Sequence, residues 1–91
     1  MSFFLSSRFR AVVRAYPKPV RVEIGRAIDL LQTSLGHPHR HAGLGIRKLV
    51  GGYFEMRAGL HLRVIFRMDS EDVVFVFAGT HDEVQRFIKS L

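Results

Sequence analysis

Apolar positions in the first third of the chain recur at helical spacing. A short apolar run from Ser2 to Leu5 predicts an edge strand, and Ser6-Ser7 then offers a helix N-cap. Two apolar stripes follow, separated by Pro17 and Pro19, and they predict two amphipathic helices joined by a proline-rich turn. We expect the second helix to end at Gly36 and the pair to form an αα-hairpin. The stripes are Phe9, Val12, Val13 and Tyr16, then Val20, Ile24, Ala27, Ile28, Leu31 and Leu35.

From Leu44 onward the pattern becomes strand-like. Leu44 to Val50 predicts a short strand, and Gly51-Gly52 predicts the turn that follows it. Tyr53 to Ala58 and His61 to Met68 both alternate between apolar and polar residues, so each predicts a strand with one face in the core. Val73 to Ala78 is apolar on both faces, as expected for a central strand covered on both sides.

The last segment predicts a third helix. Thr80 and Glu83 have the spacing of a capping box, and a helical apolar stripe follows them. The element order is therefore β-α-α-β-β-β-α, an α+β fold in which a mostly antiparallel sheet packs one face on the helical hairpin. We expect residues 1–91 to form one domain. Polar side chains between the core-facing strand positions are expected to look outward; they are Glu55, Arg57, His61, Arg63 and Arg67.

Composition excludes several classes of protein. A hydrophobic content of 47% excludes a disordered chain, and no apolar run approaches the roughly 18 residues of a membrane span. The absence of cysteine excludes a disulfide framework, a thiolate metal site and a cysteine nucleophile. The start, Met1 to Leu5, lacks the basic and long apolar regions of a signal peptide, so we expect a cytoplasmic protein.

The positive charge is concentrated in the first half of the chain. The formal net charge is +6, and residues 1–48 hold nine basic and two acidic side chains, against five and six in residues 49–91. Eleven of the fourteen basic residues are arginine, whose planar guanidinium matches phosphate oxygens. This balance favours nucleic acid or an acidic protein as a partner, with a merely solvated basic surface as the alternative.

Two loop motifs carry little chemistry. The histidines of His37-Pro38-His39-Arg40-His41 could share a metal in an extended backbone, but Arg40 repels a cation and no Cys or Asp lies nearby. A solvated loop is the better interpretation, and we expect no metal or other cofactor. Gly43-Leu44-Gly45 lacks the Lys-Ser/Thr of a phosphate loop and precedes a strand, so it is not one.

The outward sheet face is a stronger candidate. Arg57 and Arg63 lie on adjacent strands of one predicted hairpin, so both guanidinium groups can converge on one phosphate. His61 is two residues from Arg63, and His81 begins the last helix. Metal-free RNA cleavage needs such a set: a base for the 2′-OH, cations for the phosphorane, and an acid for the leaving 5′-oxygen. Alternatively, Glu55 pairs with one of the two arginines and the histidines are bystanders.

Three runs resemble the RelE/ParE toxin superfamily, whose outline is a Lys-Leu-x-Gly turn, an aromatic-Glu-x-Arg strand, a Tyr-Arg-Val strand and a Gly-x-His or Gly-x-Arg after the last strand. The element order and length match as well, so the resemblance covers nearly the whole chain. The runs are Leu49-Val50-Gly51-Gly52-Tyr53-Phe54-Glu55-Met56-Arg57, Leu62-Arg63-Val64-Ile65-Phe66 and Ala78-Gly79-Thr80-His81-Asp82.

The resemblance implies a toxin of a type II toxin–antitoxin pair. Many members cut mRNA in the ribosomal A site without a metal, whereas the ParE branch blocks DNA gyrase. We therefore expect an endoribonuclease that acts on ribosome-bound mRNA and forms a hetero-oligomer with an acidic antitoxin. A gyrase inhibitor, or a non-catalytic chain that only binds its antitoxin, is the alternative. Histidines beside an arginine cluster favour the nuclease.

The resemblance also assigns roles to residues. Arg63 falls on the arginine that stabilises the scissile phosphate, His81 on the general acid, and Phe87 near a C-terminal aromatic residue that orients or stacks a base. Lysines of the RelE prototype are replaced on the strand by Tyr53, Glu55 and Arg57, which leaves the general base open: His61 first, then Glu55 and Lys48. Further RNA or phosphate contacts are expected from Lys48, Arg57 and Arg67, and contacts to the ribosome from Arg8, Arg10, Arg14, Arg21 and Arg26.

Overall fold

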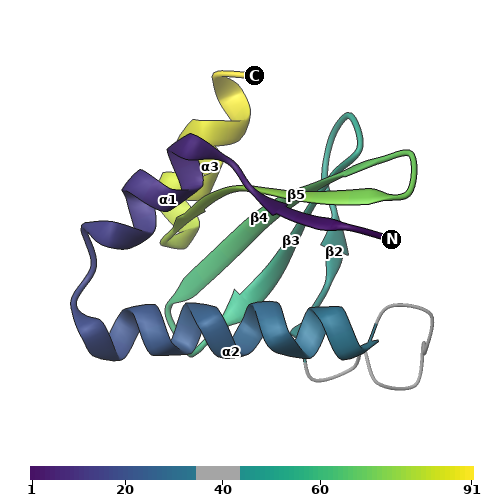
Figure 1. Cartoon of the computed structure of the whole chain (residues 1–91). Helices are drawn as coiled ribbons and strands as arrows, with labels where there is room; N and C mark the ends of the chain where they lie inside the picture. Colours follow the sequence, from purple (N-terminus) through teal and green to yellow (C-terminus); the bar gives the residue numbers. More distant parts are fainter. Residues whose placement is uncertain (35–43) are drawn as a thin grey trace.

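A computed structural model describes residues 1–34 and 44–91 of the chain (Figure 1). Five strands form one sheet in the order β1-β5-β4-β3-β2, with β1 parallel to β5 and the other neighbours antiparallel. This confirms the predicted α+β fold with a mostly antiparallel sheet, but four strands rather than three follow the helical hairpin. The elements are β1 (Phe3–Leu5), α1 (Ser7–Arg14), α2 (Lys18–Ser34), β2 (Arg47–Lys48), β3 (Tyr53–Ala58), β4 (Leu62–Asp69), β5 (Asp72–Gly79) and α3 (His81–Lys89).

The helical hairpin of α1 and α2 covers one face of the sheet. The Ser6 hydroxyl caps α1 by accepting a hydrogen bond from the Phe9 N–H at 3.0 Å. Phe9, Ile24 and Leu31 are fully buried against the sheet, so the predicted stripes face the core. The expected end of the second helix at Gly36, and the histidine loop at 37–41, lie outside the described residues. In residues 1–34 and 44–91, no helix is both long and apolar enough to cross a membrane.

The third helix, α3, covers part of the opposite face. Val84 and Phe87 pack against Ile65 of β4, which is completely buried. The expected capping box is present, because the Thr80 hydroxyl accepts from the Glu83 N–H and the Glu83 carboxylate accepts from the Thr80 N–H. The face expected to look outward is therefore only partly open. Ile65 is the apolar residue between Arg63 and Arg67 on this face of β4, and it forms the centre of a second, smaller core beneath α3.

Two strand boundaries differ from the sequence prediction. The strand expected over Leu44 to Val50 is only β2, because Leu44 turns into the core and Gly45 adopts a positive φ of 59°. The strand expected from His61 begins at Leu62, and His61 lies in the turn after β3. The short β2 pairs only with Phe54 and Glu55. Within the described residues, the outer edge of β3 beyond Glu55 therefore has no partner strand.

Candidate functional site

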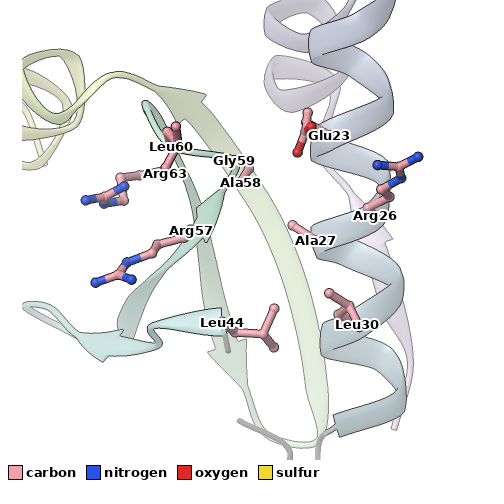
Figure 2. Close-up of a pocket in the computed structure, with 10 residues that line it drawn as sticks. All are labelled: Glu23, Arg26, Ala27, Leu30, Leu44, Arg57, Ala58, Gly59, Leu60 and Arg63. Carbon is pink, nitrogen blue, oxygen red and sulfur yellow. The ribbon is translucent and has the colours of Figure 1, made fainter. Parts of the chain in front are cut away.

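Arg57 of β3 and Arg63 of β4 are direct cross-strand partners, as the sequence predicted. Arg63 is also opposite Gly79, the last residue of β5. Figure 2 shows that both guanidinium groups project to the same side of the strands, away from α2. The sheet register thus places the two cations in one row with the end of β5, from which Thr80 and His81 lead into α3.

Neither arginine is neutralised by the described part of the chain. No carboxylate of residues 1–34 or 44–91 forms an ion pair with Arg57 or Arg63, and Arg63 donates only a long hydrogen bond of 3.3 Å to the Leu62 carbonyl. Like charges on directly opposite residues destabilise a sheet. Two guanidinium forks that share no carboxylate form a site suited to an anion such as phosphate.

The turn before β2 fixes the position of Arg57. A Cβ atom at Gly45 would lie 2.9 Å from Arg57 Nε and 3.1 Å from its Cδ, so the glycine lies directly against the arginine side chain. The positive φ of 59° favours glycine at this position as well. Sequence reasoning tested Gly43-Leu44-Gly45 only as a phosphate loop and missed this contact. The available signal was a glycine at the junction of loop and strand.

The arginine pair lines an open pocket of about 460 Å³. The pocket runs over the free edge of β3, from the arginine pair to the side of α2 (Figure 2). Most of its remaining wall is apolar, and α2 supplies the Glu23 carboxylate and the Arg26 guanidinium. The contribution of α2 was not predicted, because the sequence does not show which turn of a helix faces which strand. The lining residues are Glu23, Arg26, Ala27, Leu30, Leu44, Arg57, Ala58, Gly59, Leu60 and Arg63.

The expectation that Glu55 points into solvent is wrong, and so is the alternative that it pairs with Arg57 or Arg63. Only 5% of Glu55 is exposed, and its Oε1 forms an ion pair with Arg47 Nη2 at 2.7 Å. The other oxygen, Oε2, is buried with no hydrogen-bond partner in the described structure. Glu55 is buried because its cross-strand neighbours are Arg47 on β2 and Ile65 beneath α3. A carboxylate held in this way is poorly placed to take a proton from a substrate.

The two candidate histidines lie at different places. His61 is exposed and lines a shallow pocket beside Val20 and Glu23 of α2, which adjoins the pocket of the arginine pair and shares the turn residues Gly59 and Leu60 with it. The expectation that it lies on a strand beside Arg63 is therefore wrong, because the turn takes it out of the alternation. His81 is exposed at the start of α3, two residues after Gly79. Both histidines lie at the end of the sheet where Arg63 is: His61 in the turn just before β4, and His81 two residues after Gly79, the cross-strand partner of Arg63.

The C-terminal aromatic residue is buried. Phe87 is 6% exposed, and its ring stacks on Phe77 with centroids 4.8 Å apart and planes 8° from parallel. The Arg8 guanidinium lies 4.8 Å from the Phe87 centroid and 5.6 Å from the Phe77 centroid. Stacking of Phe87 on an RNA base would therefore require α3 to move. Arg8, expected to contact the ribosome, is used inside the molecule to join α1 to α3.

The remaining expected contacts are dispersed. Lys48 is exposed on β2, and Arg67 is half-buried opposite Tyr53. Arg26 belongs to the pocket of the arginine pair. The other three arginines expected to bind the ribosome border an apolar groove of about 390 Å³ between α1 and α2; they are Arg10, Arg14 and Arg21.

The negative charge of Glu83 in the first turn of α3 acts on Tyr16, which follows α1. The Glu83 pKa is lowered, chiefly because the Thr80 N–H and then its hydroxyl donate hydrogen bonds to the carboxylate. The Tyr16 pKa is raised by burial and, to a smaller extent, by the negative charge of Glu83. Tyr16 from the end of α1 therefore lies in the field of the first turn of α3. The helix that carries His81 is attached to the hairpin as well as to the sheet.

Comparisons with known proteins identify the fold. No protein-family model matches the sequence, and no curated protein matches it. Among solved structures, YafQ from E. coli strain BL21(DE3) has a TM-score of 0.70 at 18% identity, over 90% of this chain and 94% of YafQ. A chain of the RelB–RelE antitoxin–toxin complex from Methanococcus jannaschii has a TM-score of 0.67 at 14% identity, over 92% and 96%. A chain of the archaeal RelE–RelB complex from Pyrococcus horikoshii OT3 has a TM-score of 0.63 at 13% identity, over 87% of this chain and 92% of that chain. The chain therefore has the RelE-like fold, as the resemblance implied.

Proposed function

We propose that this chain is a toxin of the RelE/ParE superfamily that inhibits translation by cutting mRNA on the ribosome, without a metal. The observation that carries the proposal is the cross-strand pair Arg57–Arg63, two cations that no described carboxylate neutralises. The pair lies in one row with the strand end that leads to His81. Phosphate binding next to an imidazole is the arrangement that metal-free RNA cleavage requires.

In this mechanism the two arginines bind the scissile phosphate and stabilise the charge of the phosphorane. A base removes the 2′-OH proton, and the oxygen attacks phosphorus while the bond to the 5′-oxygen breaks. His81 donates a proton to that oxygen, so the products are a 2′,3′-cyclic phosphate and a 5′-hydroxyl. For the base, exposed His61 and Lys48 are favoured over Glu55, which is buried and paired with Arg47.

The partners follow from the same charges. Two of the solved complexes with this fold pair RelE with RelB, in one case named as the antitoxin. For this chain we propose an acidic antitoxin whose carboxylates cover Arg57, Arg63 and Arg67 and thereby compete with RNA phosphate. Ribosomal RNA would contact the exposed arginines of the hairpin, in a sequence-independent and salt-sensitive manner. These are Arg10, Arg14, Arg21 and Arg26, in a cytoplasmic protein.

The test is expression under tight control, with translation and DNA synthesis followed by separate radiolabels. We expect translation to stop first, and mapped mRNA ends to carry 5′-hydroxyl groups. The Arg63→Ala variant should fold, because the half-buried Arg63 side chain makes one long hydrogen bond and no ion pair, and its removal should cost about 1 kcal/mol. It should cut about 100-fold more slowly or worse. Arg86→Ala, an exposed arginine away from the pair, is the matched control.

Several results would contradict the proposal. Growth arrest by Arg63→Ala equal to that of the wild type at matched expression would remove the phosphate site. An earlier stop of DNA synthesis would point to gyrase, and harmless wild-type expression without a partner would argue against a toxin. Ends bearing 5′-phosphate, or undiminished cutting by His81→Ala, would remove His81 from the mechanism.

A further inference from the structure

The pocket at the edge of β3 combines two kinds of surface. Arg57 and Arg63 make one side cationic, with the apolar side chain of Leu60 beside Arg63, whereas Leu30 and Leu44 make the side toward α2 apolar. Leu60 is 88% exposed and Leu30 is 55% exposed. Leaving apolar surface in water is unfavourable, and here it borders a site suited to an anion. A ligand that covers both surfaces must be charged at one end and flat or apolar at the other.

We propose that this pocket binds the nucleobase next to the phosphate held by Arg57 and Arg63, and that it prefers a base with an exocyclic amine. The inference deepens the proposed function and rests on it for RNA as the substrate. Its volume of about 460 Å³ lies within the range of small-ligand sites, about 300–1,000 Å³. The base would lie against Leu60, which is beside Arg63 in Figure 2, and the phosphate would lie on the arginine row.

The second face of the sheet offers no alternative platform for a base in the described residues. Phe87 and Phe77 stack on each other, and the Arg8 guanidinium lies over both rings. Tyr53 meets the Phe87 ring edge-on, with centroids 6.5 Å apart, and belongs to the same cluster. A base therefore cannot stack on Phe77 or Phe87 without rearrangement of α3, whereas Leu60 offers an exposed apolar side chain beside Arg63.

Glu23 supplies the preference among bases. It is the only acidic residue among those that line the pocket. Its Oε2 lies 3.3 Å from the position that a Cβ of Gly59 would occupy, so the carboxylate lies against the turn that carries Leu60. A carboxylate accepts a hydrogen bond from the exocyclic amine of cytosine. Adenine and guanine also carry such an amine, whereas uracil does not.

An RNA phosphate fits this site better than the carboxylate of an acidic peptide. One guanidinium fork satisfies both oxygens of a planar carboxylate, whereas a tetrahedral phosphate can accept hydrogen bonds from two forks. The competing occupant is a peptide whose aspartate contacts the arginines and whose leucine contacts the apolar wall. Such a peptide is one of the probes in the experiment below.

The experiment is an NMR titration of the purified chain without ribosomes. The probes are inorganic phosphate, cytidine 3′-monophosphate, uridine 3′-monophosphate and a short Asp/Leu peptide. None of the nucleotides contains a phosphodiester, so none can be cut. We expect the cytidine nucleotide to bind about tenfold more tightly than phosphate, because covering on the order of 50 Å² of apolar surface contributes about that factor. The uridine nucleotide should bind more weakly than the cytidine nucleotide.

Variants localise the binding. Leu60→Ser should weaken binding of the cytidine nucleotide several-fold and leave phosphate binding unchanged, whereas Val50→Ser, at a 59% exposed residue outside the pocket, should change neither. Glu23→Ala should abolish the preference for cytidine over uridine. Equal Kd values for phosphate and both nucleotides, equal effects of Leu60→Ser and Val50→Ser, or tighter binding of the peptide would each overturn the inference.

The two proposals fail in different ways. If nucleotides bind as expected but the wild type never stops translation, the base pocket stands and the toxin function fails. If translation stops and depends on Arg63, but Leu60→Ser has no effect on nucleotide binding, the toxin function stands and the base pocket fails.

Discussion

Gly45→Ala tests whether the turn before β2 positions Arg57, which we propose binds phosphate. Two effects are expected, one on stability and one on Arg57. Alanine at a φ of 59° costs about 1 kcal/mol, which corresponds to a fall in Tm of about 4–8 °C for a domain of this size. The new Cβ would also lie 2.9 Å from Arg57 Nε. Arg57 is exposed and its side chain is flexible, so it should move aside rather than destabilise the fold.

Gly51→Ala provides a matched control. Gly51 has nearly the same φ, 60°, but a Cβ there would meet nothing within 4 Å. The two variants should therefore lose similar stability, within about 0.5 kcal/mol, in urea unfolding followed by circular dichroism. Only Gly45→Ala should weaken phosphate binding, by several-fold in the NMR titration. Equal phosphate affinity in the two variants would refute the idea that Gly45 positions Arg57.

Three further predictions concern stability. Arg47→Met should destabilise the chain by about 2 kcal/mol in urea unfolding, because it leaves the buried Glu55 carboxylate without its ion-pair partner, and the double variant with Glu55→Met should recover most of the loss; a double variant no more stable than Arg47→Met would contradict this. The Glu83 pKa is lowered in the folded state, so its contribution to stability is present above the unfolded value of about 4.3 and is lost as the pH falls through the folded value. Glu83→Gln should therefore lose stability at pH 7 but differ little from wild type near pH 2; a difference in Tm that does not change with pH would rule this out. Arg8→Ala should accelerate amide hydrogen exchange in α3, by a factor that corresponds to about 0.5–2 kcal/mol for a cation over two rings; unchanged exchange would show that the contact does not hold the helix.

Much of the candidate site was predictable because its central pair depends on a short hairpin. Arg57 and Arg63 are separated by one tight turn, so alternation along two adjacent strands is enough to place them opposite each other. Glu55 lies on the same strand, but its environment was not predictable. Its partner, Arg47, comes from a strand of two residues whose register depends on where Leu44 enters the core.

Local patterns determined the elements of this protein. The stripe that includes Phe9, the caps at Ser6 and Thr80, and the alternation of β3 each depend on neighbours within about four residues. Such short-range interactions are present in the sequence itself. They predicted three helices, the order of the strands along the chain and the arginine pair.

Tertiary packing alone decided which surfaces are closed and which are open. The sequence assigned one sheet face to solvent, but α3 buries Ile65 and uses Phe87 as core. It did not show that α2 completes the pocket beside Arg57, or that Arg8 crosses from α1 to α3. Each of these contacts joins residues distant in the chain, and its free energy depends on how whole helices seat on the sheet. That seating minimises exposed apolar area over the whole molecule, a quantity that no local pattern contains.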